Sequence, residues 1–310
     1  MSRPIRAAVI GAGYLGRFHA LKYASIPGVE LVAVVDVDRE RAAAVAREAS
    51  CRAAHDHREI LGEIDCASLA VPTPLHYPIA KDLLSAGIDV LVEKPLTLTA
   101  EEGRQLVQLA AGLGRILQVG HLERFNPALE AVRTILTEPR FVECNRLGPF
   151  VERGTDVDVV LDLMIHDLDV LLSLVRSEVA QVEAVGVPVL TPHIDLANAR
   201  LRFANGCIAN LTASRVALKR ERKLRLFQAD TYVSLDYGER HIRIVRRVVE
   251  NGTPRIDVEE VDLDDGDPLY AEIDHFLHCV RTRTRPLVDG ATALRALEVA
   301  EQIRQGMRTA

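Results

Sequence analysis

The sequence predicts an α/β protein with two parts: an N-terminal doubly wound parallel sheet, and a C-terminal α+β domain with a large open, mainly antiparallel sheet. Three observations carry this prediction. Apolar runs alternate with helical segments through the first 120 residues, which is typical of a parallel sheet covered by helices. The first apolar run ends in a glycine-rich turn. From Gln181 onward, short alternating segments follow one another, as in an antiparallel sheet.

The glycine-rich turn has the form G-x-G-x-x-G and stands between a strand and a helix, the context in which this motif indicates a dinucleotide-binding Rossmann domain. Gly11 permits the tight turn, Gly13 lets the backbone approach a pyrophosphate, and Gly16 lets the helix pack close to the strand. The N–H groups at the start of the helix would hold the diphosphate. The predicted cofactor contacts in this turn are Gly11, Gly13, Tyr14, Leu15 and Gly16.

Asp36 stands at the end of the second predicted strand, 25 residues after Gly11. This spacing is close to the roughly 20 residues expected for the acid that binds the ribose of the cofactor. Because a carboxylate repels a 2′-phosphate, Asp36 predicts NAD rather than NADP. Arg39 and Arg41 follow closely and could favour the phosphate instead. As an alternative, Gly13 and Asp36 are ordinary turn residues.

Helices and strands alternate between Asp36 and residue 120. Helices are predicted at Arg39–Glu48, at Ile79–Ala86, and after Thr99, which forms a capping box with Glu102. Strands are predicted at Cys66–Val71, Asp89–Val92 and Ile116–Val119, and the prolines between Pro72 and Pro78 predict an irregular turn. Ligands of such sheets bind beyond the carboxyl ends of the strands. Further cofactor contacts are therefore predicted at Asp36, Thr73, Glu93, Lys94 and His121.

The pattern changes after residue 120. We predict an NAD-binding domain at 1–120 and a domain for substrate binding and oligomerisation at 121–310. In the second domain, helices at Pro127–Thr137 and Val157–Val175 precede seven strand segments. Asn-Gly pairs at 205–206 and 251–252 mark hairpins between those strands. Two helices, Tyr270–Val280 and Ala291–Gly306, close the chain.

Composition and charge exclude several classes of function. The formal net charge of −6 argues against a nucleic-acid surface. No apolar run reaches about 18 residues, so no membrane span is expected. Five scattered cysteines without a C-x-x-C pair and an N-terminus that enters a strand directly predict a cytoplasmic protein with reduced thiols. His55 and His57 lack partners at ligand spacing, so no metal is predicted.

Lys94, Asp162 and His166 are the candidate catalytic residues. Lys94, held between Glu93 and Pro95, could stabilise the oxygen of a substrate hydroxyl, although it could also be a surface lysine. Asp162 and His166 lie four residues apart, on one face of a predicted helix. Asp162 would set the tautomer of the imidazole while His166 accepts a proton. Alternatively they form an ordinary helix pair, but polar groups on a mostly apolar helix more often line a cavity.

Together these residues resemble the glucose-fructose oxidoreductase/inositol dehydrogenase/MocA (Gfo/Idh/MocA) family of NAD(P)-dependent oxidoreductases, over essentially the whole chain. The resemblance implies that Lys94 and the D-x-x-x-H pair surround the reacting carbon of a sugar or cyclitol. It also implies that His76, in the Thr73-Pro74 turn, belongs to the cofactor site, and that the open sheet forms the interface of a homodimer or homotetramer. Many members carry Gly-Gly before the D-x-x-x-H helix, whereas this chain has TDVDVV at 155–160.

Three segments, 120–127, 164–167 and 191–206, look most like the branch of this family that oxidises UDP-N-acetylglucosamine at C3. A basic run from Arg215 to Arg225, with six basic residues against one acidic, would suit a diphosphate. A charged edge strand would look the same. The predicted substrate-binding residues are Lys94, Arg124, Asn126, His166 and Arg215.

The expected function is the NAD-dependent oxidation of a secondary hydroxyl of a nucleotide sugar, with C3 of UDP-N-acetylglucosamine giving the 3-keto sugar. A pyridoxal-phosphate aminotransferase would use this product in amino-sugar or lipid A synthesis. Two alternatives remain: the same reaction on a free sugar or inositol, and a non-catalytic NAD-binding sensor. The presence of Lys94, Asp162 and His166 argues against the sensor.

Overall fold

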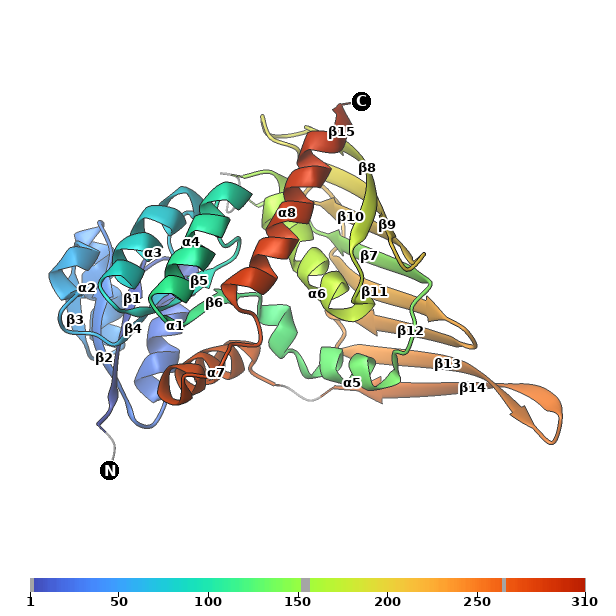
Figure 1. Ribbon diagram of the computed structural model, residues 1–310, viewed down its shortest axis with the longest axis horizontal. Helices are drawn as coiled ribbons and strands as arrows, with labels where there is room; N and C mark the ends of the chain where they lie inside the picture. Colours follow the sequence, from blue (N-terminus) through green and yellow to red (C-terminus); the bar gives the residue numbers. More distant parts are fainter. Residues whose placement is uncertain (1–2, 152–156, 264–265, 310) are drawn as a thin grey trace. The chain divides into compact units, whose positions relative to one another are not determined.

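The computed structural model describes residues 3–151, 157–263 and 266–309 (Figure 1). The chain divides into two compact units: Met1–Phe125 with Asp267–Arg295, and Asn126–Gly266 with Ala296–Ala310. The sequence assigned the segment 267–295 to the second domain. In the structure this segment joins the first unit because α7 (Pro268–Thr282) buries Ile273, Phe276 and Leu277 in the first unit's core.

The first unit contains a six-stranded parallel sheet, in the order β3-β2-β1-β4-β5-β6. Its strands are β1 (Ile5–Ile10), β2 (Val29–Val35), β3 (Arg52–Ala54), β4 (Cys66–Leu69), β5 (Asp89–Glu93) and β6 (Leu117–Gly120). The helices that connect them are α1 (Tyr14–Ser25), α2 (Arg39–Glu48), α3 (His76–Ser85) and α4 (Ala100–Gly112). The predicted parallel sheet is confirmed.

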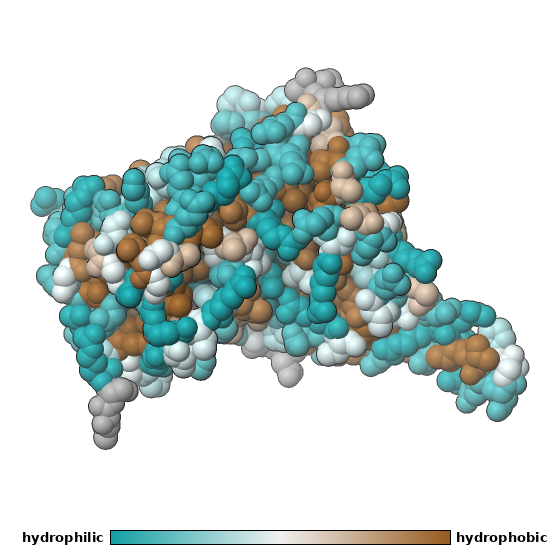
Figure 2. All heavy atoms as spheres, in the orientation of Figure 1, coloured by the Kyte–Doolittle hydropathy of each residue, from teal (hydrophilic) through white to brown (hydrophobic). Residues whose placement is uncertain are grey.

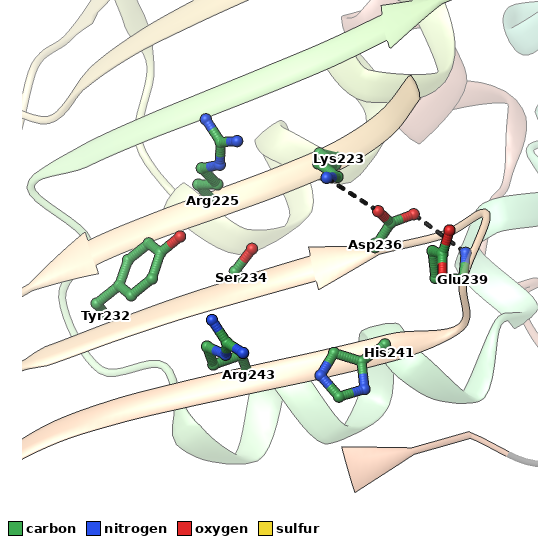
Figure 3. A pocket seen from close by; sticks show the side chains of 8 residues that line it. All are labelled: Lys223, Arg225, Tyr232, Ser234, Asp236, Glu239, His241 and Arg243. Atoms are coloured by element: carbon green, nitrogen blue, oxygen red, sulfur yellow. Dashed lines mark hydrogen bonds and ion pairs between the residues drawn. The ribbon is translucent and has the colours of Figure 1, made fainter. Parts of the chain in front are cut away.

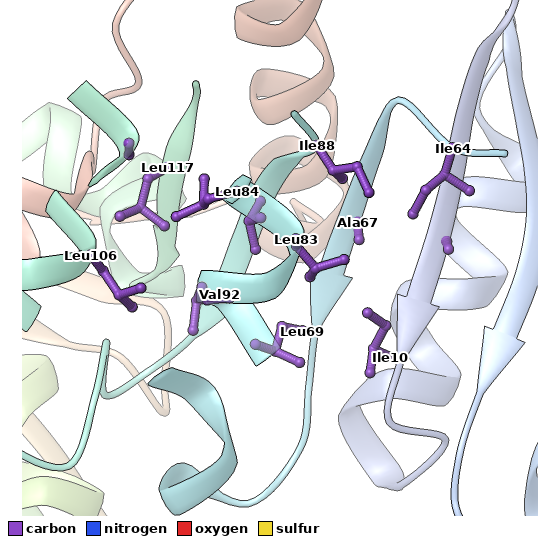
Figure 4. Packing of buried hydrophobic residues seen from close by; sticks show 14 of the residues in the cluster. Ile10, Ile64, Ala67, Leu69, Leu83, Leu84, Ile88, Val92, Leu106 and Leu117 are labelled. Atoms are coloured by element: carbon purple, nitrogen blue, oxygen red, sulfur yellow. The ribbon is translucent and has the colours of Figure 1, made fainter. Parts of the chain in front are cut away.

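Two apolar clusters cover the two faces of this sheet. Successive residues of β1 alternate between them: Ala8 and Ile10 belong to one cluster, and Ala7 and Val9 belong to the other. This alternation is what a strand buried on both faces requires. Figure 4 shows the first cluster, in which Leu83 and Leu84 of α3 and Leu106 of α4 pack over the strands.

The proline-rich segment after β4 is more regular than predicted. Thr73–Leu75 forms a 3₁₀ turn (η2), and α3 begins at His76 rather than at Ile79. Pro78 therefore lies in the first helical turn, where its missing N–H would have no intrahelical partner in any case. The predicted capping box between Thr99 and Glu102 is present at the start of α4.

The second unit contains a nine-stranded mixed sheet, in the order β14-β13-β12-β11-β7-β10-β9-β8-β15. Its strands are β7 (Phe141–Leu147), β8 (Val179–Val187), β9 (Leu196–Phe203), β10 (Ile208–Ser214), β11 (Glu221–Gln228), β12 (Thr231–Asp236), β13 (His241–Glu250), β14 (Thr253–Asp262) and β15 (Met307–Thr309). All pairs are antiparallel except β7 with β10 and β8 with β15. The mainly antiparallel sheet is thus confirmed, and β7, which was not predicted, lies in its middle.

Helices α5 (Pro127–Ile135) and α6 (Ile165–Val175) lie on one face of this sheet (Figures 1 and 3). The predicted single helix over 157–175 is wrong in its first part, because Val160–Met164 forms a π-helical turn (η4). Thr155 and Asp156 of the divergent TDVDVV segment lie outside the described residues. The last helix, α8 (Gly290–Gly306), precedes β15.

The hairpin of β13 and β14 carries exposed apolar side chains. Val249, Ile256 and Val258 are each more than half exposed. Figure 2 shows apolar atoms on the outer part of this hairpin, the orange arm of Figure 1. Exposed apolar residues grouped in this way are typical of surfaces that contact another protein.

The loop between β8 and β9 is anchored by Asp195, which is fully buried. Its Oδ2 accepts hydrogen bonds from the N–H groups of Val189, Leu190 and Thr191 at 2.6–2.8 Å, and its Oδ1 accepts one from the Thr191 hydroxyl at 2.8 Å. Burial by itself raises the pKa of Asp195. The four donors outweigh burial and lower the pKa from 3.8 to about 2.

We expect Asp195→Asn to lower the free energy of unfolding by about 2 kcal/mol at neutral pH. Because the folded-state pKa is below the unfolded one, this contribution is complete above the unfolded value of 3.8 and is lost as the pH falls towards about 2. Urea denaturation at pH values above and below this range measures the difference, with the exposed Asp274→Asn as control. An equal loss of stability at both pH values would contradict the prediction.

Candidate active site

The glycine turn between β1 and α1 is tightly packed on the protein side and open on the other. Gly11 has a φ of +98°, and a Cβ on it would lie 2.2 Å from the carbonyl oxygen of Ala70. A Cβ on Gly16 would lie 1.7 Å from the carbonyl oxygen of Gly11, whereas a Cβ on Gly13 would meet no atom within 4 Å. Gly13 is also the N-cap of α1 and provides no capping side chain. The turn therefore fits the diphosphate of a dinucleotide.

Asp36 lies at the end of β2, beside this turn. Its Oδ2 accepts a hydrogen bond from the N–H of Ala12 at 2.7 Å, and its Oδ1 accepts one from the N–H of Asp38 at 2.9 Å. The carboxylate is thereby fixed next to the glycine turn, where a ribose would follow a bound diphosphate. Arg41 is also within reach, with its Nε 3.7 Å from Asp36 Oδ2.

Glu93 and Lys94 follow directly at the end of β5. The Glu93 side chain points into the first unit, where its Oε1 lies 2.8 Å from Nε2 of His19 on α1. The other ring nitrogen of His19 lies 3.0 Å from the Ser68 hydroxyl, which also contacts the hydroxyl of Tyr23. Sequence reasoning placed Glu93 at the cofactor and missed His19. The sequence could have indicated a buried His19, because it lies three residues after Gly16 and therefore on the same side of α1.

His76 connects two loops at the same edge of the sheet. Its Nδ1 lies 2.8 Å from the carbonyl oxygen of Pro95, and its Nε2 lies 2.9 Å from that of Val71. Burial lowers the pKa of His76, so the ring is neutral and donates to one of these oxygens. Both ring nitrogens face protein atoms. The geometry therefore shows that His76 holds the turn after Lys94, and its predicted contact with the cofactor stays a prediction.

Thr73 and His121 are both buried at the carboxyl ends of β4 and β6, as expected from the sheet topology. Arg124 follows in a short 3₁₀ helix, η3 (Leu122–Phe125), and its N–H donates to the carbonyl oxygen of His121 at 2.9 Å. These residues belong to the first unit. Its strand ends thus gather the glycine turn, Asp36, Thr73, Lys94 and His121 at one edge of the sheet.

In the second unit, Asp162 lies in the π-helical turn η4 and His166 lies in the first turn of α6. The sequence predicted one regular helix for both residues. A π-helical turn inserted into an α-helix changes the direction of the side chains it carries, and such turns are frequent at functional sites. Asp167, next to His166, forms a buried two-point ion pair with Arg146 of β7, with N–O distances of 3.0 and 2.9 Å.

Two residues predicted to bind substrate have clear structural contacts. Asn126 is the N-cap of α5 and accepts a hydrogen bond from the N–H of Ala128 at 3.0 Å. Arg215 is buried, donates to the carbonyl oxygen of Val157 at 2.7 Å and lies 3.4 Å from Asp195 Oδ1. These contacts give both residues a role in the fold, and their predicted contacts with the substrate stay predictions.

The other part of the basic run lies on the face of the sheet turned away from the helices (Figure 3). Lys223 lies 3.2 Å from Asp236, and Arg225 lies 3.4 Å from Glu143. They border a shallow hollow of about 430 Å³ lined by Lys223, Arg225, Tyr232, Ser234, Asp236, Glu239, His241 and Arg243. The alternative prediction of a charged edge strand is wrong, because β11 pairs with β12 on one side and with β7 on the other. These ion pairs indicate a charged surface in the interior of the sheet.

Comparison with known proteins identifies the chain. Residues 5–121 match the profile of the GFO_IDH_MocA oxidoreductase family with an NAD-binding Rossmann fold, and residues 129–231 match the GFO/IDH/MocA C-terminal domain. The UDP-N-acetylglucosamine 3-dehydrogenase of Acidithiobacillus ferrooxidans is 41% identical over 303 residues, which cover 97% of this chain and 96% of the relative. This chain belongs to the Gfo/Idh/MocA family.

The solved structure of that Acidithiobacillus enzyme superposes on this Gfo/Idh/MocA chain with a TM-score of 0.92 and 40% identity, covering 99% of this chain and 98% of the other. A second relative, the scyllo-inositol 2-dehydrogenase (NAD(+)) of Bacillus subtilis, is 28% identical over 99% of this chain and 96% of its own length. The predicted family and fold are confirmed. This Gfo/Idh/MocA protein is an oxidoreductase that acts on CH–OH groups with a nicotinamide cofactor. Across the described part of the chain, no helix is both long and apolar enough to cross a membrane.

Proposed function

We propose that this protein oxidises a secondary hydroxyl of a nucleotide sugar with NAD, and that its substrate is UDP-N-acetylglucosamine, oxidised at C3. The observation that carries the proposal is the 41% identity with a UDP-N-acetylglucosamine 3-dehydrogenase along almost the whole of both chains. The inositol dehydrogenase that spans a similar length is 28% identical. Oxidation of a free inositol is therefore the second candidate.

In the proposed reaction, the bound nicotinamide supplies the hydride acceptor. His166 takes the proton of the C3 hydroxyl, Asp162 orients the imidazole, and Lys94 stabilises the negative charge that develops on the oxygen. His76 supports Lys94 by its position between the carbonyl oxygens of Val71 and of Pro95, the residue after the lysine. The glycine turn and Asp36 position the dinucleotide.

The product would be a 3-keto sugar, and a ketone of this kind suits a pyridoxal-phosphate aminotransferase as the next enzyme. This places the protein in cytoplasmic synthesis of lipid A or another amino-sugar product. We also propose a homodimer or homotetramer formed through the open face of the second sheet. The exposed apolar side chains of the β13–β14 hairpin support such an interface, and the mass of the protein in solution tests it.

The substrate proposal is tested by incubating the enzyme and NAD with UDP-N-acetylglucosamine, UDP-glucose, free N-acetylglucosamine and myo-inositol, and following the absorbance of NADH. Because oxidation of a secondary alcohol is unfavourable at neutral pH, an aminotransferase and an amino donor are added to remove the ketone. We expect an amino sugar, identified by mass spectrometry, from UDP-N-acetylglucosamine. Turnover of inositol without binding of UDP, measured by calorimetry, would favour the second candidate.

Cofactor preference gives a separate prediction at Asp36. We expect a higher kcat/KM with NAD than with NADP. Asp36→Ser should reduce the ratio of these two kcat/KM values roughly tenfold, since the Asp36 carboxylate and a 2′-phosphate about 4 Å away would repel each other by about 1–4 kcal/mol. Asp36→Asn is the matched control, because it keeps an oxygen for the N–H of Ala12 while removing the charge. A native preference for NADP that Arg41→Ala abolishes would show that Arg41 determines the choice.

A further inference from the structure

Glu272 is a carboxyl group buried in the first unit on α7. The side chain is fully buried, and across the described parts of the chain no N–H or O–H group donates a hydrogen bond to either of its oxygens. An ionised carboxylate without donors is strongly disfavoured in such a place, and a buried acid in this situation takes up a proton instead. Nothing in the proposed mechanism uses Glu272.

Glu93 and His19 are ionisable groups that lie close to Glu272. One oxygen of each glutamate and a ring nitrogen of His19 all lie within 4.8 Å of one another. Glu93 already has a donor, because its Oε1 lies 2.8 Å from His19 Nε2. Two carboxyl groups that share a dry site do not both ionise. The negative charge therefore belongs on Glu93 and the proton belongs on Glu272.

The charged and polar groups around the pair support this assignment. Burial raises the pKa of Glu272, and the charge of Glu93 raises it further. Burial also raises the pKa of Glu93, but the hydrogen bond from His19 and the positive charge of Lys94 help to outweigh it, and that pKa is lowered. Tyr23 of α1 is a buried neutral phenol whose pKa is raised, mainly by burial.

β6 closes the site on its remaining side. The side-chain amide nitrogen of Gln118 donates to the backbone carbonyl oxygen of Glu272 at 3.0 Å, which fixes this part of α7 against β6. A Cβ on Gly120 would lie 3.0 Å from Glu93 Oε1, so the backbone of β6 leaves Glu93 little freedom to turn away. Glu93 and Glu272 are thereby kept together.

We propose that Glu272 is a neutral carboxylic acid in the folded protein, that it donates a hydrogen bond to Glu93, and that it thereby acts as a positioning residue for the turn that carries Lys94. The role for Lys94 rests on the proposed function. Glu272 lies on α7, in the last part of the chain. The C-terminal segment thus provides a hydrogen-bond donor that stabilises the turn of Lys94. The proton also removes the repulsion that a second buried carboxylate would exert on Glu93.

The same three side chains are also a possible ligand set for a divalent metal, because carboxylate oxygens and imidazole nitrogens both bind zinc. The direct contact between His19 and Glu93 and the contact of His19 Nδ1 with Ser68 satisfy the histidine without a metal. A proton on Glu272 is then sufficient to explain how the two carboxyl groups lie close together without a metal ion.

Infrared difference spectroscopy of the full-length protein tests the proposal directly. At neutral pH the wild type should show the carbonyl stretch of a protonated carboxylic acid, shifted in D₂O, and Glu272→Gln should lack it. Glutamine keeps a neutral side chain of the same shape with an N–H donor. We therefore expect Glu272→Gln to keep kcat within about twofold and the pH profile unchanged. Glu272→Leu, which has no donor, should lower kcat by roughly tenfold to a hundredfold with the KM for NAD nearly unchanged.

Three results would overturn the proposal. A spectrum identical in wild type and Glu272→Gln would mean that Glu272 is ionised. One equivalent of zinc or another divalent metal in the purified wild type, absent from Glu272→Gln, would identify a metal site instead. Native kcat in Glu272→Leu would remove the positioning role. If the band is present but no sugar is oxidised, the proposed function fails while the neutral acid remains.

Discussion

Replacing Lys94 or His166 with alanine should lower kcat by roughly 10²–10⁴, the usual range for a lost acid–base group. Neither residue is assigned to the diphosphate or the ribose, so the affinity for NAD should stay nearly unchanged. His166 is expected to accept the hydroxyl proton, and Lys94 to stabilise the oxygen that remains. Steady-state kinetics with the sugar substrate give kcat, and calorimetric titration with NAD gives the affinity.

Asp162→Asn should cost less than loss of the histidine, because it misorients the imidazole without removing it. His278→Ala on the surface of α7 and Lys219→Ala in the exposed β10–β11 loop are matched controls and should leave kcat unchanged. Near-native turnover in His166→Ala would assign proton removal to Lys94 or to water. A large loss of NAD affinity in Lys94→Ala would make the lysine a cofactor contact instead.

The first sheet was predictable because its signals are local. Continuous apolar runs such as CASL in β4 indicate strands buried on both faces, and the glycine turn stands at a fixed place between β1 and α1. The same holds for the two Asn-Gly hairpins of the second sheet, whose turns contain left-handed residues at Gly206, Asn251 and Gly252.

β7 escaped prediction because its inward face contains an arginine. The strand alternates between half-buried and buried positions, and its buried residues are Val142, Cys144 and Arg146. An arginine at a buried position interrupts the alternation of apolar and polar residues by which a strand is predicted. Its ion pair with Asp167, on a different element 21 residues away, makes the position acceptable. Local sequence does not contain that pairing.

Some features of the candidate site could likewise be predicted from the sequence, and others could not. The motifs predicted which loops carry the candidate residues, but they did not predict in which direction each side chain points. Glu93 and His76 were both expected at the cofactor, yet Glu93 contacts His19 and His76 contacts two backbone carbonyl oxygens. Glu272 is one of two acidic residues in the amphipathic helix α7, and its sequence context resembles that of any surface glutamate. Its burial follows from the packing of α7 on the first unit.

The ion pair between Arg146 and Asp167 should be the most sensitive point of the second unit. Asp167→Ala leaves a buried guanidinium without its carboxylate, and we expect the free energy of unfolding to fall by about 3–5 kcal/mol. Replacing both residues with apolar ones of similar volume, as in Arg146→Met with Asp167→Leu, should recover most of this loss because no charge then remains buried. Urea denaturation followed by circular dichroism measures both variants.

The matched control is the ion pair of Arg255 and Glu250, which is exposed and 3.6 Å long. Glu250→Ala should change the stability by less than about 1 kcal/mol, since exposed charges are already solvated. The double apolar variant also separates stability from catalysis, because Asp167 lies in the first turn of α6 together with His166. If it folds stably but loses turnover, the ion pair orients the turn that carries the histidine. If Asp167→Ala costs no more than Glu250→Ala, water or another group compensates Arg146, and the buried pair is not what holds α6 against β7.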